Sequence, residues 1–172
     1  MIARGMLTHA NPPAAALGCE PGMSCRDAAA CLQQAAANWL EPPPLWALDS
    51  ASLAGADQVR AVVVTGSHGG LLGGRADTAL KIAALAALFN DAGIGIDEAG
   101  VTRLPALDAR GIAAGTVAAA SARIGDARST YEDGILTRVN RCAADFGIGP
   151  GMSAREFVAI IRNTAAERGK SA

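Results

Sequence analysis

The sequence predicts an α/β fold, a single domain in which helices flank a small, mostly parallel sheet in a three-layer-like arrangement. Short apolar runs of strand length alternate with segments of helical periodicity, an order typical of parallel sheets with crossover helices. A chain of 172 residues is long enough to form one core. Because 51% of the residues are hydrophobic and only 3% are aromatic, small aliphatic side chains must fill that core.

The expected domain occupies residues 24–168. Residues 1–23 are rich in Pro, Gly and Ala and lack periodicity, which predicts a poorly ordered lead-in, and residues 169–172 are expected to form a frayed tail. Ser24 and Asp27 form a capping-box-like start for a first helix that ends before the Pro-Pro-Pro connector. The apolar positions of this helix are Ala28, Leu32, Ala35 or Ala36, and Trp39.

Four segments have the composition of strands. Residues 45–48 are predicted as a short strand or edge segment, residues 59–65 as a buried strand rich in valine, and residues 112–119 as a further buried strand. The KIAALAALFNDAG sequence is ambiguous, because it fits one long helix or a helix followed by a strand at residues 86–89. We favour the second interpretation, since strong turn-forming residues follow directly.

Helices are expected between and after these strands. Arg75 is predicted to start one of them, and Gly100 and Pro105 divide the next region into two short helical turns, with Gly111 in the left-handed position after the second. A capping box at 129–132 predicts a helix with a periodic apolar face at Ile135, Val139, Cys142 and Phe146. A second box at 153–156 predicts a final helix with an inner face of Phe157, Ile160, Ile161 and Thr164.

Polar residues cluster where three of the predicted strands end. Right-handed crossovers place the carboxyl ends of parallel strands at one edge, where open α/β sheets bind their ligands. The three ends carry residues 65–70, 90–96 and 121–129. We therefore expect a candidate site at this edge of the sheet.

Ser67 and His68 follow the valine strand in a window that resembles a nucleophile elbow but departs from G-x-S-x-G at its first position. A serine hydrolase also needs a base, and the chain has only His68 and His9. Two adjacent residues on a sharp turn seldom face one another, so a Ser-His-Asp triad is not favoured. The window also resembles the histidine segment of caspase-like cysteine peptidases, a family that requires a cysteine where this chain has Asn90-Asp91.

Two other interpretations remain open for this edge. In the first, His68 is a general acid or base partnered by Asp91 or Asp126, or carboxylates including Asp97 bind a divalent cation. In the second, exposed backbone amides and arginines bind a small carboxylate or phosphate. The anion-binding candidates are Gly66, Ser67, Gly69, Gly70, Ser121, Arg123 and Arg128.

Each interpretation has a structural alternative. Asp91 and Asp126 can accept backbone N–H groups in turns, and Arg123 and Arg128 can pair with Asp126, Glu132 and Asp133. The glycines match neither the P-loop pattern nor a clean G-x-G-x-x-G, so a nucleotide is weakly supported and no cofactor is identified. The four cysteines, which contain no C-x-x-C pair, are expected to be reduced thiols rather than metal ligands.

Composition narrows the class of protein further. The formal net charge is −1, the charges are interspersed and aromatic residues are few, which argues against nucleic-acid binding. No apolar run approaches the roughly 20 residues that span a bilayer, and the first residues lack the order of a secretory signal, so a cytoplasmic protein is expected. The leading hypothesis is a hydrolase- or lyase-like enzyme acting on an anionic small molecule. The alternative is a non-catalytic small-molecule-binding or assembly subunit that forms a homo-oligomer.

Overall fold

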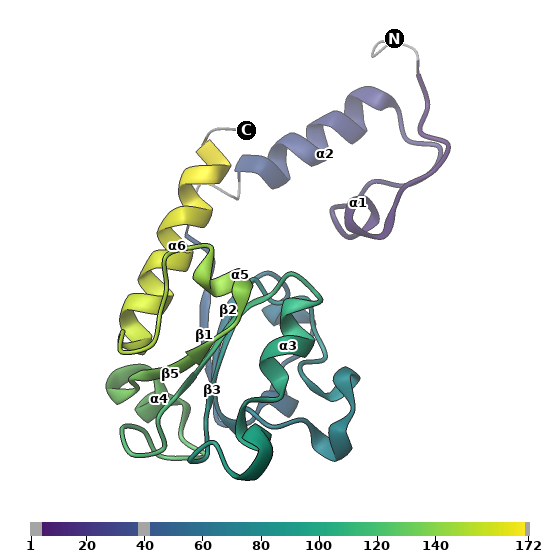
Figure 1. Cartoon of the computed structure of the whole chain (residues 1–172). Coiled ribbons are helices and arrows are strands. Elements are labelled where there is room, and N and C mark those ends of the chain that lie inside the picture. The colour runs from purple at the N-terminus through teal and green to yellow at the C-terminus, as the bar shows by residue number, and fades with distance from the viewer. Residues whose placement is uncertain (1–4, 38–41, 171–172) are drawn as a thin grey trace. The chain divides into compact units, whose positions relative to one another are not determined.

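The computed structural model describes residues 5–37 and 42–170, which fall into two compact units (Figure 1). One unit is Pro43–Thr164, which contains the whole sheet. The other is Met1–Pro42 together with Ala165–Ala172. The domain boundaries expected at residues 23 and 168 stay predictions.

The sheet has five strands in the order β1-β2-β3-β4-β5, and the first four are parallel. β5 (Leu136–Val139) pairs with β4 in the antiparallel direction. The predicted α/β class with a mostly parallel sheet is therefore confirmed. The parallel strands are β1 (Leu45–Leu48), β2 (Val62–His68), β3 (Ala86–Asn90) and β4 (Ala113–Val117).

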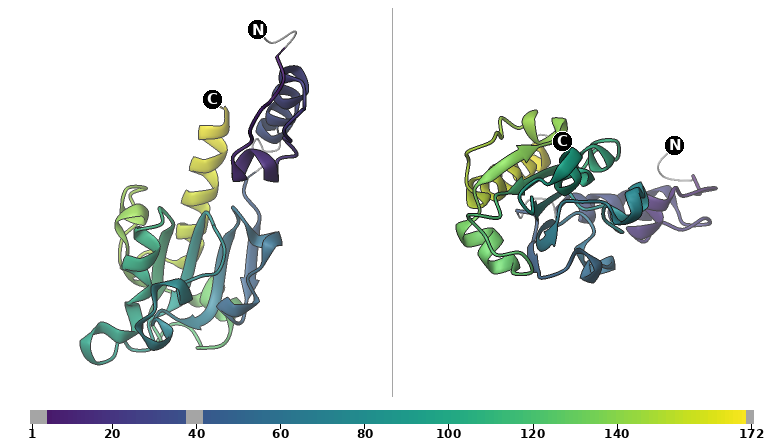
Figure 2. Two further views of the ribbon diagram at one scale, coloured as in Figure 1. Left: turned by 90° about the vertical axis from the view of Figure 1, so that its right-hand side faces the viewer. Right: turned by 60° about the horizontal axis from the view of Figure 1, so that its bottom comes forward.

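Small aliphatic side chains fill both faces of the sheet, as the composition predicts. On one face, Val63 and Phe89 pack in a cluster with Leu107 of α3 (Arg103–Asp108). On the other, Leu88 packs in a cluster with Phe157 of α6 (Ala154–Lys170). Figures 1 and 2 show α3 and this part of α6 on opposite sides of the strands.

The connection from β2 to β3 contains no α-helix, so the helix predicted to start at Arg75 is wrong. Two short 3-10 turns, η4 (Leu72–Gly74) and η5 (Ala76–Thr78), lie there instead. Two arginines from outside the segment satisfy its carbonyl groups. Arg103 donates to the carbonyls of Thr78 and Ala79. Arg110 donates to Leu80 O at 2.5 Å and Ile82 O at 2.6 Å. These bonds replace the helical hydrogen bonds that the segment lacks.

The long helix predicted from Ser129 to Phe146 is also wrong, because this region forms α4 (Ala127–Asp133), β5 and α5 (Arg141–Ala144). Gly134 ends α4 in extended backbone, and a Cβ atom there would lie 2.7 Å from Val117 Cγ1 of β4. The chain therefore turns into a strand at this point. The capping box predicted at Ser129 is replaced by Asp126, whose side chain caps α4.

Other predictions are confirmed. β1 has the expected limits, and β3 extends the predicted strand by Asn90. η6 (Ile96–Val101) and α3 are two short helical segments as expected, but Gly100 lies inside η6 and Pro105 inside α3 rather than dividing them. Gly111 has a positive φ, 69°, as predicted. Ser153 and Glu156 form the predicted capping box of α6, with Glu156 N donating to Ser153 Oγ at 3.2 Å. Short 3-10 turns after β1 complete this unit, η2 (Ala51–Leu53) and η3 (Ala56–Gln58).

In residues 5–37 of the other unit the chain forms α1 (Pro12–Ala16) and α2 (Cys25–Ala37). Within the expected lead-in, α1 begins after Asn11, whose Oδ1 accepts a hydrogen bond from Ala14 N. The predicted start of α2 is confirmed, since Ser24 Oγ accepts from Asp27 N at 3.1 Å. The Trp39 position assigned to this helix lies outside the described residues. All four cysteines are free thiols.

Candidate functional site

Hydrogen bonds join the loops that follow β2, β3 and β4 at the carboxyl edge of the sheet. Gly69 N donates to Asn90 O at 2.7 Å, and Gly125 N donates to Gly66 O at 2.7 Å. The three loops lie along one edge of the strands (Figure 2). The carboxyl ends of β2, β3 and β4 therefore lie at one edge of the sheet, where the sequence places polar residues.

His68 is the last residue of β2 and pairs with Asn90 of β3 where the register between the strands shifts. Its ring is half-buried, and Nδ1 accepts a hydrogen bond from Gly70 N at 3.1 Å. In the neutral imidazole this bond places the proton on Nε2. Within the described part of the chain, the ring has no other hydrogen bond and no carboxylate partner.

The glycines of this turn allow a close approach of neighbouring backbone. A Cβ atom on Gly69 would lie 2.5 Å from Gly100 O, and one on Gly70 would lie 2.6 Å from Ala99 O. Both turn amides also have partners, because Gly69 N–H is bound to Asn90 and Gly70 N–H to His68. An anion at this turn would have to compete with those hydrogen bonds.

Ser67 lies in β2 and its hydroxyl oxygen accepts a hydrogen bond from Ala51 N at 2.9 Å. This contact directs the side chain toward η2, which follows β1. Consecutive residues of a strand point to opposite faces, so Ser67 and His68 are not arranged as a nucleophile and its base. Gly66, the preceding residue, allows the loop from β4 to approach, since a Cβ atom there would lie 2.5 Å from the carbonyl carbon of Gly125.

Asp91 is buried and joins two loops. Its Oδ1 accepts from Gly93 N at 2.8 Å and from Ala119 N at 2.9 Å. Asn90 is also buried, and its Nδ2 donates to Ala122 O at 2.9 Å. These two side chains hold the loops after β3 and β4 together, which is the structural alternative named for Asp91.

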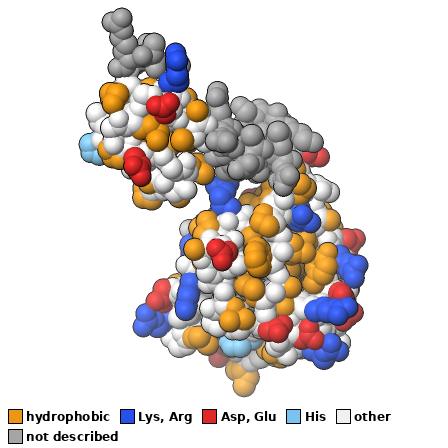
Figure 3. Space-filling model, turned by 180° about the vertical axis from the view of Figure 1, so that it is seen from behind, with side chains coloured by type: hydrophobic (Ala, Val, Ile, Leu, Met, Phe, Trp, Pro, Cys, Tyr) orange, Lys and Arg blue, Asp and Glu red, His pale blue; other side chains and the backbone are white. Residues whose placement is uncertain are grey.

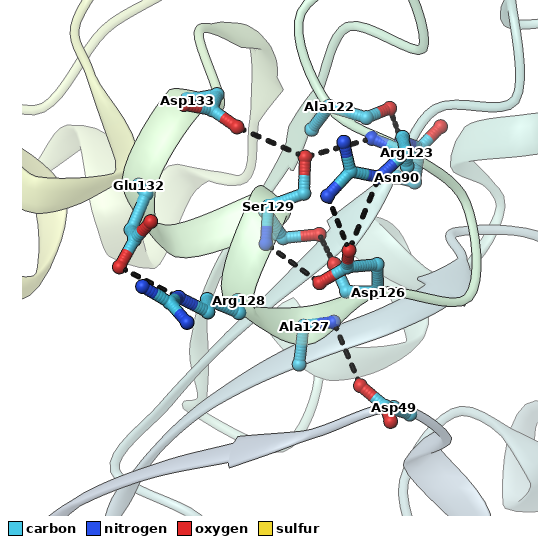
Figure 4. A network of polar contacts seen from close by, with 11 residues as sticks. Asp49, Asn90, Ala122, Arg123, Asp126, Ala127, Arg128, Ser129, Glu132 and Asp133 are labelled. Carbon is cyan, nitrogen blue, oxygen red and sulfur yellow. Dashed lines mark hydrogen bonds and ion pairs between the residues drawn. The ribbon is translucent and has the colours of Figure 1, made fainter.

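Asp126, Arg123 and Ser129 form a connected polar network at the start of α4 (Figure 4). Asp126 Oδ1 accepts from Ser129 N at 2.8 Å, and its Oδ2 lies 2.7 Å from Arg123 Nη2. The Ser129 amide first, and the Arg123 guanidinium second, hold the pKa of Asp126 below its ordinary value. The Asp49 carboxylate accepts from Ala127 N at 3.0 Å and caps the same helix.

The remaining candidates also have partners. Arg128 Nε lies 3.0 Å from Glu132 Oε1, one helical turn away on α4. Ser121 Oγ donates to Ala118 O at 2.9 Å and accepts from Ile135 N at 2.9 Å. The structure thus brings all the predicted residues to one edge, but it pairs their side chains with backbone or with each other rather than with His68.

Arg103 is a residue of this edge that the sequence interpretation missed. It is buried at the start of α3, with its Nε donating to Gly70 O at 3.0 Å and its main-chain N donating to Gly69 O at 2.8 Å. Burial lowers the pKa of its guanidinium. The signal was available in the sequence, because Arg103 lies four residues before Leu107 and so shares the apolar face of a short helix.

Exposed aliphatic side chains surround the same edge. The loops after β1, β2, β3 and β4 each present one, namely Leu53 (63% exposed), Leu72 (57%), Ile96 (87%) and Ile124 (55%). On the face of the molecule in Figure 3, acidic and basic side chains are intermixed with apolar ones. The described residues thus show no surface of a single charge on that face.

No protein-family model matches the chain, and no curated protein or solved structure matches it either. In the described residues, no three His, Cys, Asp or Glu side chains are grouped so that they could hold a metal ion. No helix in residues 5–37 and 42–170 is long and apolar enough to cross a membrane.

Proposed function

We propose that this chain is a hydrolase- or lyase-like enzyme acting on an anionic small molecule at the carboxyl edge of its sheet. The observation that carries the proposal is the hydrogen bonding of the His68 ring. Its Nδ1 is occupied by Gly70 N–H, and its Nε2 has no partner among the described residues. The ring is therefore oriented by the turn while one polar atom remains available to a ligand.

This geometry refines the expected role of His68. A neutral imidazole with Nδ1 occupied offers Nε2–H as a hydrogen-bond donor. Such a donor stabilises negative charge that develops on a substrate oxygen, which both hydrolysis and elimination at a carbonyl or carboxylate produce. We therefore assign His68 the role of an electrophilic donor rather than of a base. Asp91 and Asp126 support the loops around it.

Arg123 and Arg128 are the proposed source of attraction for an anion. Their side chains are 77% and 82% exposed, and each guanidinium shares only part of its donors with a neighbouring carboxylate. The free donors can bind carboxylate or phosphate oxygens at the rim of the edge. These exposed ion pairs contribute little to stability, so they can exchange partners when a ligand arrives.

A thermal-shift experiment tests the proposal. The probes are pyruvate, succinate, citrate and inorganic phosphate, each tested with wild type, His68→Ala and His9→Ala. A ligand at about ten times its Kd adds about 1.4 kcal/mol to the free energy of unfolding and raises Tm by roughly 3–6 °C. We expect the shift in wild type and His9→Ala but not in His68→Ala. The absence of a shift with every probe, or an equal shift in His68→Ala, would contradict the proposed role.

One observation favours a second candidate function, an assembly subunit that pairs with another copy of this chain. Exposed aliphatic side chains on four successive loops of one edge form a surface suited to association. Light scattering after size exclusion tests it. Ile96→Asp should dissociate an oligomer, whereas Val59→Asp, an exposed aliphatic position before β2, should not. A wild-type chain that is monomeric at high concentration would exclude this function.

A further inference from the structure

We infer that Arg103 is a positioning residue for His68, and that it fixes the imidazole in the Nε2–H tautomer so that the site accepts a ligand oxygen. The inference rests on the proposed function of His68 and adds to it the residue that sets the state of the ring. Arg103 does not touch the imidazole. It acts through the Gly69–Gly70 turn, which lies between them.

A single peptide group connects the two residues. The carbonyl of Gly69 accepts a hydrogen bond from the main-chain N–H of Arg103 at 2.8 Å, a bond that Arg103→Met retains, and the amide of Gly70 donates to His68 Nδ1 at 3.1 Å. These are the two ends of the peptide unit that joins the glycines. A bond to the carbonyl end polarises the peptide and strengthens the bond from its N–H end. The amide is thereby directed at Nδ1, and the ring proton remains on Nε2.

The guanidinium of Arg103 holds the turn from its other side. Its Nε donates to Gly70 O at 3.0 Å, and its Nη1 donates to Thr78 O at 2.7 Å and to the carbonyl of Ala79. Through these bonds the Arg103 side chain links Gly70, whose N–H binds His68, to Thr78 and Ala79 in the β2–β3 connection. The position of the Gly70 N–H therefore depends on the Arg103 side chain as well as on its backbone.

The guanidinium of Arg103 is a buried cation that binds backbone carbonyls rather than a carboxylate. Arg103 is buried, its Cζ lies 5.2 Å from the ring centroid of Phe89, and no carboxylate among the described residues pairs with it. Burying an unpaired charge is expensive, and well-packed apolar side chains are often at least as stabilising. The hydrogen bonds of Arg103 to the carbonyls of Gly70, Thr78 and Ala79 offset part of this cost, and they tie the cation to the Gly69–Gly70 turn.

The fixed tautomer defines the chemistry of the ligand. Nε2–H donates and cannot accept, so the group that faces His68 must have an oxygen lone pair, as a carboxylate or carbonyl does. A ligand that offers an N–H group at this point would leave two donors facing each other, which is unfavourable. The ligand class is therefore an anion that presents a carboxylate, carbonyl or phosphate oxygen to Nε2–H.

Nitrogen NMR of the ligand-free protein tests the inference. Two-bond 1H–15N correlations, recorded at about pH 8, show which ring nitrogen carries the proton in the neutral imidazole. The chain has only two histidines, so His9 is an internal reference. We expect His68 to be mainly Nε2–H in wild type, and its ratio of Nε2–H to Nδ1–H to fall roughly threefold or more in Arg103→Met.

Arg110→Met is the matched control, because Arg110 also donates to carbonyls of the same connection, at Leu80 and Ile82. It should lower stability without changing the His68 ratio. An unchanged ratio in a folded Arg103→Met variant, or an equal fall in Arg110→Met, would overturn the inference. Should Arg103→Met not fold, Arg103→Lys decides, because its ammonium reaches fewer of the carbonyls and the ratio must again fall.

The outcomes separate this inference from the proposed function. An unchanged tautomer in Arg103→Met overturns the positioning role, while ligand binding that depends on His68 would still support the function. A wild-type His68 that is mainly Nδ1–H overturns the inference directly. Loss of His68-dependent ligand stabilisation with an intact Nε2–H tautomer would instead overturn the function and leave the positioning role standing.

Discussion

The loop after β3 contains a position where replacing alanine by glycine should raise the free energy of unfolding, although the same replacement in a helix lowers it. Ala92, Ile94, Asp97 and Glu98 all have positive φ angles, between 50° and 66°. An L-residue in the left-handed region is destabilised by roughly 1–2 kcal/mol, whereas glycine is not. Such strained backbone collects at functional sites, and this loop lies at the carboxyl edge beside the candidate site.

Ala92→Gly should therefore stabilise the protein. Ala92 is exposed, has a φ of 50° and donates its N–H to Asn90 Oδ1 at 2.9 Å, a bond that glycine retains. The relief of strain, about 1–2 kcal/mol, exceeds the extra backbone entropy that glycine loses on folding, about 0.5–1 kcal/mol. The free energy of unfolding should rise by about 0.5–1 kcal/mol.

Urea denaturation followed by circular dichroism measures this change, with the m-value checked for constancy. Ala159→Gly is the matched control, because Ala159 is exposed inside α6 and the same substitution should there destabilise the protein by about 1 kcal/mol. Destabilisation of similar size in both variants would show that Ala92 has no left-handed strain, and the argument for a strained loop would fail.

Three further predictions concern packing and charge. Gly66→Ala should destabilise the protein by about 1–3 kcal/mol because its Cβ would meet backbone atoms, whereas Gly149→Ala, with nothing within 4 Å, should not; urea denaturation compares the two. Asn140→Ala removes a buried amide that bonds the backbone on both sides, so the same assay should give a loss of roughly 2–4 kcal/mol. The pKa of Asp126 is lowered, first by the Ser129 amide, so its carboxylate stabilises the protein above the unfolded-state pKa of about 3.9 and this stabilisation disappears at lower pH. The difference in free energy of unfolding between wild type and Asp126→Asn should therefore shrink as the pH falls through this range. A difference that stays constant would contradict the assignment.

The strands were predictable because each has a local signal. The valines of β2 and the small apolar residues of β4 form short apolar runs bounded by turn residues. β5 was missed because Ile135 just before it, Val139 within it and Cys142 beyond it have the spacing of a helix face. This region forms a strand rather than a helix because Gly134 ends α4 at a point where neighbouring atoms of β4 leave no room for a side chain. Asn140 then caps a separate helix.

The connection from β2 to β3 shows a different limit of local patterns. Residues after Arg75 have a sequence that can start a helix, and nothing nearby forbids it. The hydrogen bonds that stabilise the irregular backbone come from Arg103, which begins α3 after β3 and η6, and from Arg110, which follows α3. Tertiary contacts of this kind override helix propensity and cannot be read from a window of ten residues.

At the candidate site, sequence reasoning located the edge but not the role of each group. Asp91 and Asp126 were candidates for catalysis because carboxylates after strands often bind ligands. In each of them, however, one carboxylate oxygen accepts hydrogen bonds from backbone amides. Which atom a carboxylate contacts depends on loop conformation, and the loops here are set by glycines at positive φ and by close backbone packing. Spacing along the chain contains no information on those contacts.

At this edge some polar side chains hold the loops in place and His68 is left to face the ligand, so the proposed chemistry can rest on one histidine. A site that stabilises negative charge needs donors fixed in advance, so that they do not reorganise during the reaction. Asn90 and Asp91 fix the loops, and Arg103 fixes the turn that holds His68. With those polar groups committed to backbone partners, the proposed donor at the turn is Nε2–H, which the Gly70 N–H orients before any ligand binds, while the exposed guanidinium groups of Arg123 and Arg128 lie at the rim. The rigidity of the surrounding network is therefore part of the proposed mechanism, and loosening the turn should impair His68 without removing it.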